Sequence, residues 1–375
     1  MNGRQNIIWI IIFTILLVGC WDERLLRKHS LILAIGYDLE GDDIILKTVS
    51  LPKESGGKLE QIEPGNQSEV ITTSGNTARD TDDELDRILP QKFDRSKART
   101  VLLGKELATD GIFSTLDSLY RDLRSPLNAR VAIIDGTARE ALNINRDYSF
   151  LISEFYFDFL QGAEESGLIK NENVQSICPL LLSDGKDIVL PYVTIENNGK
   201  EARIKGLALF SDDQMTGELN GKESTMFLIL SNQLESNTKL NFKIEQDKIE
   251  NDKNFVDLVF HELKRKQKIT TKNEKIKVNI DISLRVEIDE YPADHLNDEK
   301  KAKALSKKIE KQMNHLALET IEKMQKANND SLGIGEKMKA YHHTTWEKID
   351  WDKFYSEIPI ETSFNVDIVH HGIIN

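Results

Sequence analysis

The chain has 375 residues and a net charge of −13, with 30% of its residues charged. An acidic chain lacks the basic surface that binds nucleic acid, and its overall charge does not favour adhesion to anionic lipid. The length suggests two or three domains, and the two cysteines leave no internal disulfide if the first one carries a lipid, so the fold must rest on its core. Cys178 lies in an apolar stretch and is expected to be a buried, inert thiol.

The first predicted feature is an export signal. Residues 7–18 are almost wholly apolar and follow a short basic start. Twelve residues are too few for a membrane-spanning helix, which takes about 20, but they match the apolar core of a secretory signal. The run ends in LVGC at 17–20, which is similar to the lipobox of bacterial lipoproteins. We therefore predict a signal peptide over 1–19 and a lipid on Cys20 as the membrane anchor, the alternative being an uncleaved signal anchor.

The first half of the mature chain alternates short apolar runs with helical patterns, which indicates an α/β or α+β arrangement. The predicted elements are, in chain order, a hairpin of strands at 31–38 and 43–51, a polar excursion at 52–70, a helix at 77–89, a strand at 99–104, a helix at 112–123, a strand at 129–135, a helix opened by Thr137 with Glu140 in a capping box, and an aromatic helix at 150–160.

The second half is richer in alternating strands. Residues 188–198 read as a strand that Pro191 confines to a sheet edge or a strand start. A hairpin is predicted around 211–214. Residues 275–289 alternate apolar and polar side chains, which is typical of an antiparallel sheet with one covered face. The cover is predicted to be a long amphipathic helix at 298–327, and 359–369 form a last strand.

These elements predict a multidomain α+β fold with mixed sheets and packed helices, ending in an antiparallel sheet covered by the long helix. The expected boundaries are an N-terminal α/β domain at 20–178 with the excursion 52–70, a small middle module at 179–205 that the excursion would join, and a C-terminal α+β domain at 206–375.

No catalytic or metal-binding motif stands out. Residues 217–224 have three residues between their glycines where a phosphate-binding loop has four. The histidine pairs at 342–343 and 370–371 direct adjacent side chains apart, so neither pair chelates a metal alone. Acidic pairs such as Asp82 and Asp83 are typical of solvated helix faces. We therefore predict no enzyme activity, no cofactor and no metal.

The connection after the long helix is unusual because it combines an acid, glycines and aromatic residues. Asp330 or Ser331 is expected to cap the next helix, and losing such a cap costs about 1 kcal/mol. Nearby glycines permit a tight turn. The segment is either a structural corner or a partner-binding surface, since tryptophan is frequent among interface anchors. Its candidate residues are Asp330, Gly333, Gly335, Trp346 and Trp351.

Four stretches resemble the Ger(x)C family, the lipoprotein C subunits of the germinant receptors of endospore-forming bacteria. They are GCWDERLL…LILAIGYD, KARTVLLGKELATDGIFSTLDSLYRD, GLALFSDDQMTGELNGKES and DSLGIGEKMKAYHHTTWEKIDW, in family order over nearly the whole mature chain. One departure is local: the family's usual start is W-D-x-R-E-L, whereas residues 23–25 here shuffle the charges. The D-x-x-G-x-G pattern is intact at 330–335.

The resemblance implies a non-enzymatic subunit held by acyl chains such as palmitate on the extracytoplasmic face of the spore inner membrane. It implies two integral membrane partners, a transporter-like A-type subunit and a B-type subunit, which together trigger germination in response to nutrients. It also implies three mixed α/β domains. The alternative function is an extracytoplasmic solute-binding lipoprotein that captures the nutrient itself, which requires a deep cleft between two lobes.

Overall fold

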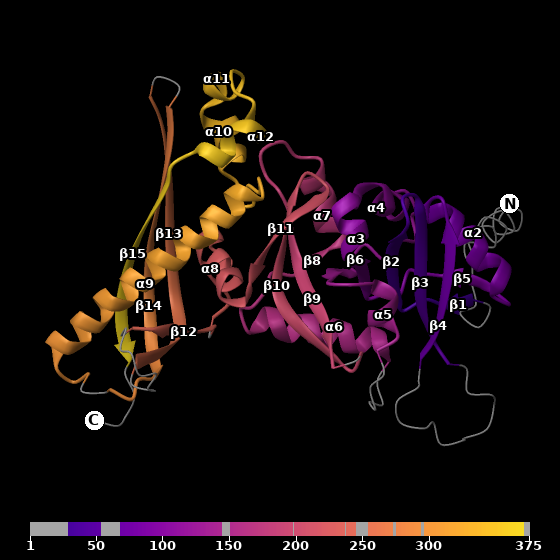
Figure 1. Cartoon of the computed structure of the whole chain (residues 1–375), viewed down its shortest axis with the longest axis horizontal. Helices are drawn as coiled ribbons and strands as arrows, with labels where there is room; N and C mark the ends of the chain where they lie inside the picture. The colour runs from indigo at the N-terminus through magenta and orange to yellow at the C-terminus, as the bar shows by residue number, and fades with distance from the viewer. Residues whose placement is uncertain are drawn as a thin grey trace, which may run out of the picture.

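The computed structural model describes residues 29–53, 68–144, 151–197, 199–236, 238–244, 254–272, 275–293 and 296–370. The expected signal peptide and Cys20 lie outside these residues. The described chain is elongated, with its first strands at one end and a C-terminal sheet at the other (Figure 1). No helix in the described ranges is both long enough and apolar enough to cross a bilayer.

A nine-stranded mixed sheet forms the N-terminal part, with the order β11-β10-β9-β7-β6-β2-β3-β4 and β8 paired to β7. The predicted hairpin is confirmed, because β2 and β3 pair antiparallel on either side of Gly41, whose φ is 64°. The strands are β2 (Ala34–Glu40), β3 (Ile44–Pro52), β4 (Ser68–Gly75), β6 (Thr100–Gly104), β7 (Arg130–Ile134), β8 (Glu172–Asn173), β9 (Val189–Glu196), β10 (Glu201–Ser211) and β11 (Gln214–Asn220). A separate parallel pair joins β1 (His29–Leu31) to β5 (Lys92–Asp94).

Helices cover both faces of this sheet and bury one apolar core on each side. One face carries α2 (Ala78–Ile88), α3 (Lys105–Asp110), α4 (Phe113–Tyr120) and α7 (Val174–Leu181). The other face carries α5 (Ala138–Leu142), α6 (Ile152–Glu165) and α8 (Gly221–Ser231). The helix that Thr137 was predicted to open is confirmed as α5, since the threonine hydroxyl accepts the Glu140 N–H at 3.2 Å.

The C-terminal sheet has the order β12-β13-β14-β15 and is covered on its inner face by the long helix α9 (Glu299–Lys326). Its strands are β12 (Lys239–Lys243), β13 (Phe255–Lys272), β14 (Lys275–Glu290) and β15 (Ile360–His370). The alternation predicted for β14 and the helix predicted after it are confirmed. The sheet is antiparallel except that β15 runs parallel to β14. After α9 come the short helices α10 (Ile334–Tyr341), α11 (His343–Trp346), α12 (Trp351–Phe354) and η3 (Tyr355–Glu357).

Helix α8 connects the two parts. Every residue from Glu223 to Leu230 is buried, so this stretch of the helix has no solvent face. Its start is fixed by a capping box, in which the Asn220 and Glu223 side chains each accept the other's backbone N–H. The Glu223 carboxylate also accepts the Lys323 ammonium of α9 at 2.8 Å. The apolar core therefore continues from the nine-stranded sheet through α8 into the C-terminal sheet.

Some expectations require correction. Pro191 does not place β9 at an edge, because β9 lies between β10 and β7. The proline is tolerated there because β7 pairs only with Tyr192 and Val193, so Pro191 precedes that ladder. Cys178 is half-buried rather than fully buried. The nine-stranded sheet runs across the expected boundaries near residues 178 and 205, so the division into three units stays a proposal.

Gly206 is expected to be indispensable for the pairing of β10 with its neighbours. It has a φ of 147° at a register shift of β10, and an added Cβ would lie 1.9 Å from the Leu219 carbonyl oxygen. We expect Gly206→Ala to lower the free energy of unfolding by about 3 kcal/mol or more. Gly199→Ala is the matched control, because its φ is 79° but nothing lies within 4 Å of the added methyl. Urea unfolding should show a loss of about 1 kcal/mol for the control, and equal losses would contradict the steric argument.

Candidate functional site

The structure brings the predicted corner residues together at the turn from α9 into α10. Asp330 is buried, with 1% of its surface exposed, and Trp351 is buried at 7%. Both glycines are buried and Trp346 is half-buried. The expected lipid acceptor, Cys20, lies outside the described residues, so its role remains a proposal.

Asp330 holds the start of α10, as the sequence predicted for this residue or Ser331. One carboxylate oxygen accepts the Ile334 N–H at 3.0 Å and the other accepts the Gly335 N–H at 2.6 Å. Gly333 immediately precedes these two residues and has a φ of 66°, a left-handed conformation that favours glycine. The first free N–H groups of the helix are thus satisfied by a carboxylate that is itself inaccessible to solvent.

The aromatic residues pack behind this turn. The rings of Trp346 and Trp351 lie 5.3 Å apart, and Trp351 lies 6.0 Å from Tyr355. A Cβ at Gly335 would lie 2.5 Å from the Trp351 indole nitrogen and 2.7 Å from the Cα of Gly185. The glycine is therefore needed for close contact with two other segments as well as for the turn.

The corner forms a joint to the nine-stranded sheet. The Asn329 amide, fully buried, donates to the carbonyl oxygens of Ile188 at 2.9 Å and Phe210 at 2.7 Å. The Asp330 N–H donates to the Asp187 carboxylate at 2.6 Å, and the Glu336 N–H donates to the Gly185 carbonyl at 2.8 Å. These contacts favour the structural interpretation of the corner, because its backbone N–H groups and the Asn329 side chain bond to the loop before β9 and to the end of β10.

Two carboxyl groups meet in this joint, and both are driven toward the neutral form. Burial raises the pKa of Asp330 well above its ordinary value, against the opposing effect of the two N–H groups that it accepts. Burial also raises the pKa of Asp187 to about 6, while the Asp330 and Asp212 N–H groups act in the opposite direction. The joint therefore contains acids that titrate in the range where other carboxyl groups remain ionised.

A buried ion-pair network in the N-terminal part was not predicted. Asp82 is 2% exposed and contacts the Lys47 ammonium and the Arg95 guanidinium, the latter at 2.9 Å. Arg95 also donates to Asp122 at 3.0 Å. The interpretation of Asp82 as a solvated helix residue was therefore wrong, whereas Asp83 is exposed. The available signals were a lysine inside an apolar strand and the position of Asp82 on the same helix face as Ala78 and Leu85.

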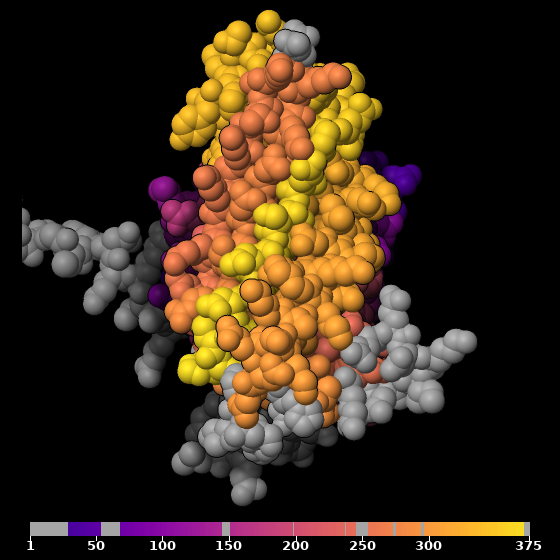
Figure 2. Space-filling model, turned by 90° about the vertical axis from the view of Figure 1, so that its left-hand side faces the viewer, coloured from indigo at the N-terminus to yellow at the C-terminus, as the bar shows by residue number. Residues whose placement is uncertain are grey.

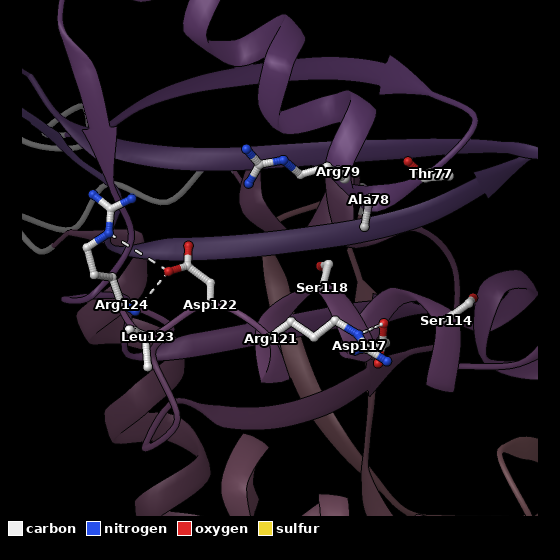
Figure 3. Close-up of a pocket in the computed structure, with 10 residues that line it drawn as sticks. All are labelled: Thr77, Ala78, Arg79, Ser114, Asp117, Ser118, Arg121, Asp122, Leu123 and Arg124. Carbon is white, nitrogen blue, oxygen red and sulfur yellow. Dashed lines mark hydrogen bonds and ion pairs between the residues drawn. The ribbon is translucent and has the colours of Figure 1, made fainter.

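A surface hollow of about 820 Å³ lies beside this network, between the start of α2 and α4 (Figure 3). Its arginines already have carboxylate neighbours: Arg121 with Asp117 at 2.7 Å, Arg124 with Asp122 at 3.8 Å, and Arg79 with an aspartate at 3.8 Å. The hollow therefore presents few free donors to a solute. Within the described ranges, no group of three or more side chains is placed to hold a metal ion.

Comparisons with known proteins cover almost the whole chain. Residues 22–195 match a family model described as spore germination protein N-terminal domain, and residues 205–372 match one described as spore germination B3/GerAC like, C-terminal. The chain is 21% identical to spore germination protein GerQC of Bacillus cereus, over 97% of this chain and 99% of that protein. It is 24% identical to spore germination protein KC of Bacillus subtilis, over 98% of this chain and 95% of that protein.

A solved structure has the same fold. The crystal structure of the GerBC protein superposes with a TM-score of 0.56, covering 89% of this chain and 96% of that one at 15% sequence identity. This likeness agrees with the mixed α+β architecture and with the sheet and long helix of the C-terminal part.

Asp330 should matter more for stability than an exposed cap. Asp330→Ala leaves the Ile334 and Gly335 N–H groups buried without an acceptor, at about 1–3 kcal/mol each. We therefore expect a loss of about 2–4 kcal/mol in urea unfolding, above the 1 kcal/mol anticipated from sequence. Asp330→Asn keeps an acceptor and should lose less. The exposed Asp352→Ala serves as the control, and a loss at Asp330 no greater than at this control would contradict the capping role.

The raised pKa of Asp187 predicts a pH-dependent joint. Folded Asp187 binds a proton up to about pH 6, whereas the unfolded residue releases it near 3.8. The stabilisation is therefore present below pH 4 and is lost as the pH rises through 6. As the pH rises from 4 to above 6, we expect the free energy of unfolding of the wild type to fall by on the order of 1–2 kcal/mol relative to that of Asp187→Asn. Unfolding of both proteins at pH 4 and pH 7 measures this difference, and parallel pH profiles would exclude the effect.

Proposed function

The chain belongs to the Ger(x)C family of spore germination proteins, and on that premise we propose that it is a non-enzymatic subunit of a nutrient germinant receptor. The observation that carries the proposal is the match of two germination family models to residues 22–195 and 205–372, together with relatives that the chain matches over 95% and 99% of their own length. We propose further that acyl chains on Cys20 hold the subunit on the extracytoplasmic face of the spore inner membrane, beside integral A-type and B-type subunits.

Several structural features support an assembly role. In the joint, the Asn329 amide nitrogen and the Asp330 carboxylate have their partners within the chain, and the arginines of the hollow beside α2 and α4 already face carboxylates. A solute-binding protein would instead present free polar groups converging in a deep cleft. Titration of the full lipidated chain with amino acids and sugars by calorimetry separates the two functions, because saturable binding would favour the solute-binding alternative.

Cys20→Ala is expected to remove the anchor and with it the nutrient response. Stable attachment to a bilayer takes two or more acyl chains, and the acidic chain offers no comparable attraction. We expect the variant to leave the membrane fraction in cells that lack the partner subunits, and spores carrying it to lose their germination response. Cys178→Ala should change neither property. Retention of the Cys20 variant in membranes, or an unchanged response to nutrients, would contradict the proposal.

A further inference from the structure

The two outer strands of the C-terminal sheet are covered to different degrees. On β15, the Val366 N–H donates to the Glu310 carboxylate of α9 at 3.2 Å. The Thr362 hydroxyl donates to Asn314 of the same helix at 3.1 Å. In Figure 2, the yellow strand β15 lies directly beside the lighter orange α9. This edge of the sheet is therefore closed by the protein's own helix.

The edge formed by β13 is open along most of its length. Strand β12 pairs with β13 only from Phe255 to Val259, and the described chain contains no strand that pairs with residues 261–272 on that side. The side chains on the inner face of this stretch are half-buried, whereas the residues opposite them on β14 are at most 3% exposed. An edge of this length with backbone groups available is a template for an additional strand.

The open edge is strongly basic in an acidic protein. Between Leu263 and Val278 the sequence carries seven lysine and arginine residues and one acid, against a net charge of −13 for the whole chain. Lys264, Lys266 and Lys268 are exposed on the outer face of β13. A second copy of the same edge would be repelled, whereas an acidic segment would be attracted.

The inner face of this edge contains a cation without an acceptor. Arg265 stands opposite Ile282 in the apolar row of β14, and its Nε and Nη2 are buried with no hydrogen-bond acceptor among the described residues. These two donors point to the same side of the guanidinium and form the fork that binds a carboxylate bidentately. The amide nitrogen of Gln267 also lacks an acceptor, while its oxygen accepts the Lys337 ammonium at 2.6 Å.

We propose that β13 from Leu263 to Lys272 is the docking edge for an extended acidic segment of another protein, which adds a strand to the sheet and places a carboxylate on the Arg265 fork. An added strand lies about 4.8 Å from its neighbour and directs alternate side chains to the two faces. Its outward acids meet the exposed lysines, and an inward acid reaches Arg265 and Gln267. Main-chain bonds supply affinity and the charges supply specificity. The partner is an integral membrane subunit of the receptor, an identification that rests on the proposed function.

Lysines on an open edge also protect a protein from self-association, but this role does not require an uncompensated guanidinium on the inner face. Burial lowers the pKa of Arg265, because its guanidinium is withdrawn from water. A purely protective edge predicts aggregation when the charges are removed. A docking edge predicts loss of a partner without loss of stability.

The test compares Arg265→Met with Arg285→Met in the full lipidated chain purified from spore membranes in detergent. Arg285 is exposed on the outer face of β14 and contacts Glu262 at 3.4 Å, so it serves as a control on the same sheet. We expect the amount of membrane subunit that copurifies with each Arg265→Met chain to fall by on the order of tenfold or more. Its melting temperature should equal or exceed that of wild type, because an unpaired buried charge has been removed. The control should retain the partner.

Three results would overturn the inference. If Arg265→Met retains the partner, the edge is not the docking surface. If it loses partner and melting temperature in proportion, or aggregates, the arginine is structural or protective. If the wild-type chain recovers no membrane subunit at all, the proposed function fails together with the inference, whereas the first two results leave the proposed function intact.

A second measurement identifies the segment. A photoreactive amino acid at Lys268 should crosslink to an acidic stretch of a membrane subunit, and the same probe at Asn365 on β15 should not. Changing the crosslinked acid to lysine should weaken recovery, and combining it with Arg265→Glu should restore it. Crosslinks to neutral or basic segments, or failure of the paired exchange to restore recovery, would overturn the acidic-strand assignment.

Discussion

The placement of the C-terminal sheet depends on a few buried hydrogen bonds at the end of α9. Where β9 and β10 meet, the carbonyl groups of Ile188 and Phe210 are shielded from water, and a buried carbonyl without a donor costs about 1–3 kcal/mol. The single amide of Asn329 satisfies both. Because Asp330 follows directly and organises α10, one pair of residues fixes the direction of the long helix and the position of the tryptophan cluster. Apolar packing around α8 then contributes the buried surface between the two sheets. The directional hydrogen bonds of Asn329 and Asp330 set how the two sheets are oriented.

Much of the fold could be predicted where one local pattern dominated. The alternation of β14, the stripe of α9 and the hairpin of β2 and β3 each follow from residues close in sequence. The strand β13 was missed because its distal half carries Lys264, Arg265 and Lys266 in succession, so charge falls on both faces and the alternation disappears. The parallel pairing of β14 with β15 was also missed, because the whole of α9 separates the two strands and no local signal specifies their direction.

The candidate corner could be predicted in composition but not in its contacts. An acid followed by two glycines indicates a capped turn, and the tryptophans indicate packing. The residues that receive this turn, Asp187 and Gly185, lie more than 140 positions earlier in the chain. For the same reason Asp82 was taken as solvated, since Lys47 and Arg95 come to it from two other strands or loops. Ion pairs between residues far apart in the sequence produce no repeating pattern from which they could be predicted.

The burial of α8 from Glu223 to Leu230 imposes an order on the folding of the newly made chain. When α8 has been synthesised, the strands up to β11 are already present, but α9 and the C-terminal strands that cover its remaining side are not. Contacts between segments so far apart form late, and until then the side of α8 that packs against α9 stays uncovered along the apolar run from Met226 to Leu230. An intermediate with such a surface associates readily with other chains. The last third of the sequence thus covers a core that is incomplete while the chain is being made. Chains that stop before β15 are expected to aggregate rather than fold into a shorter domain.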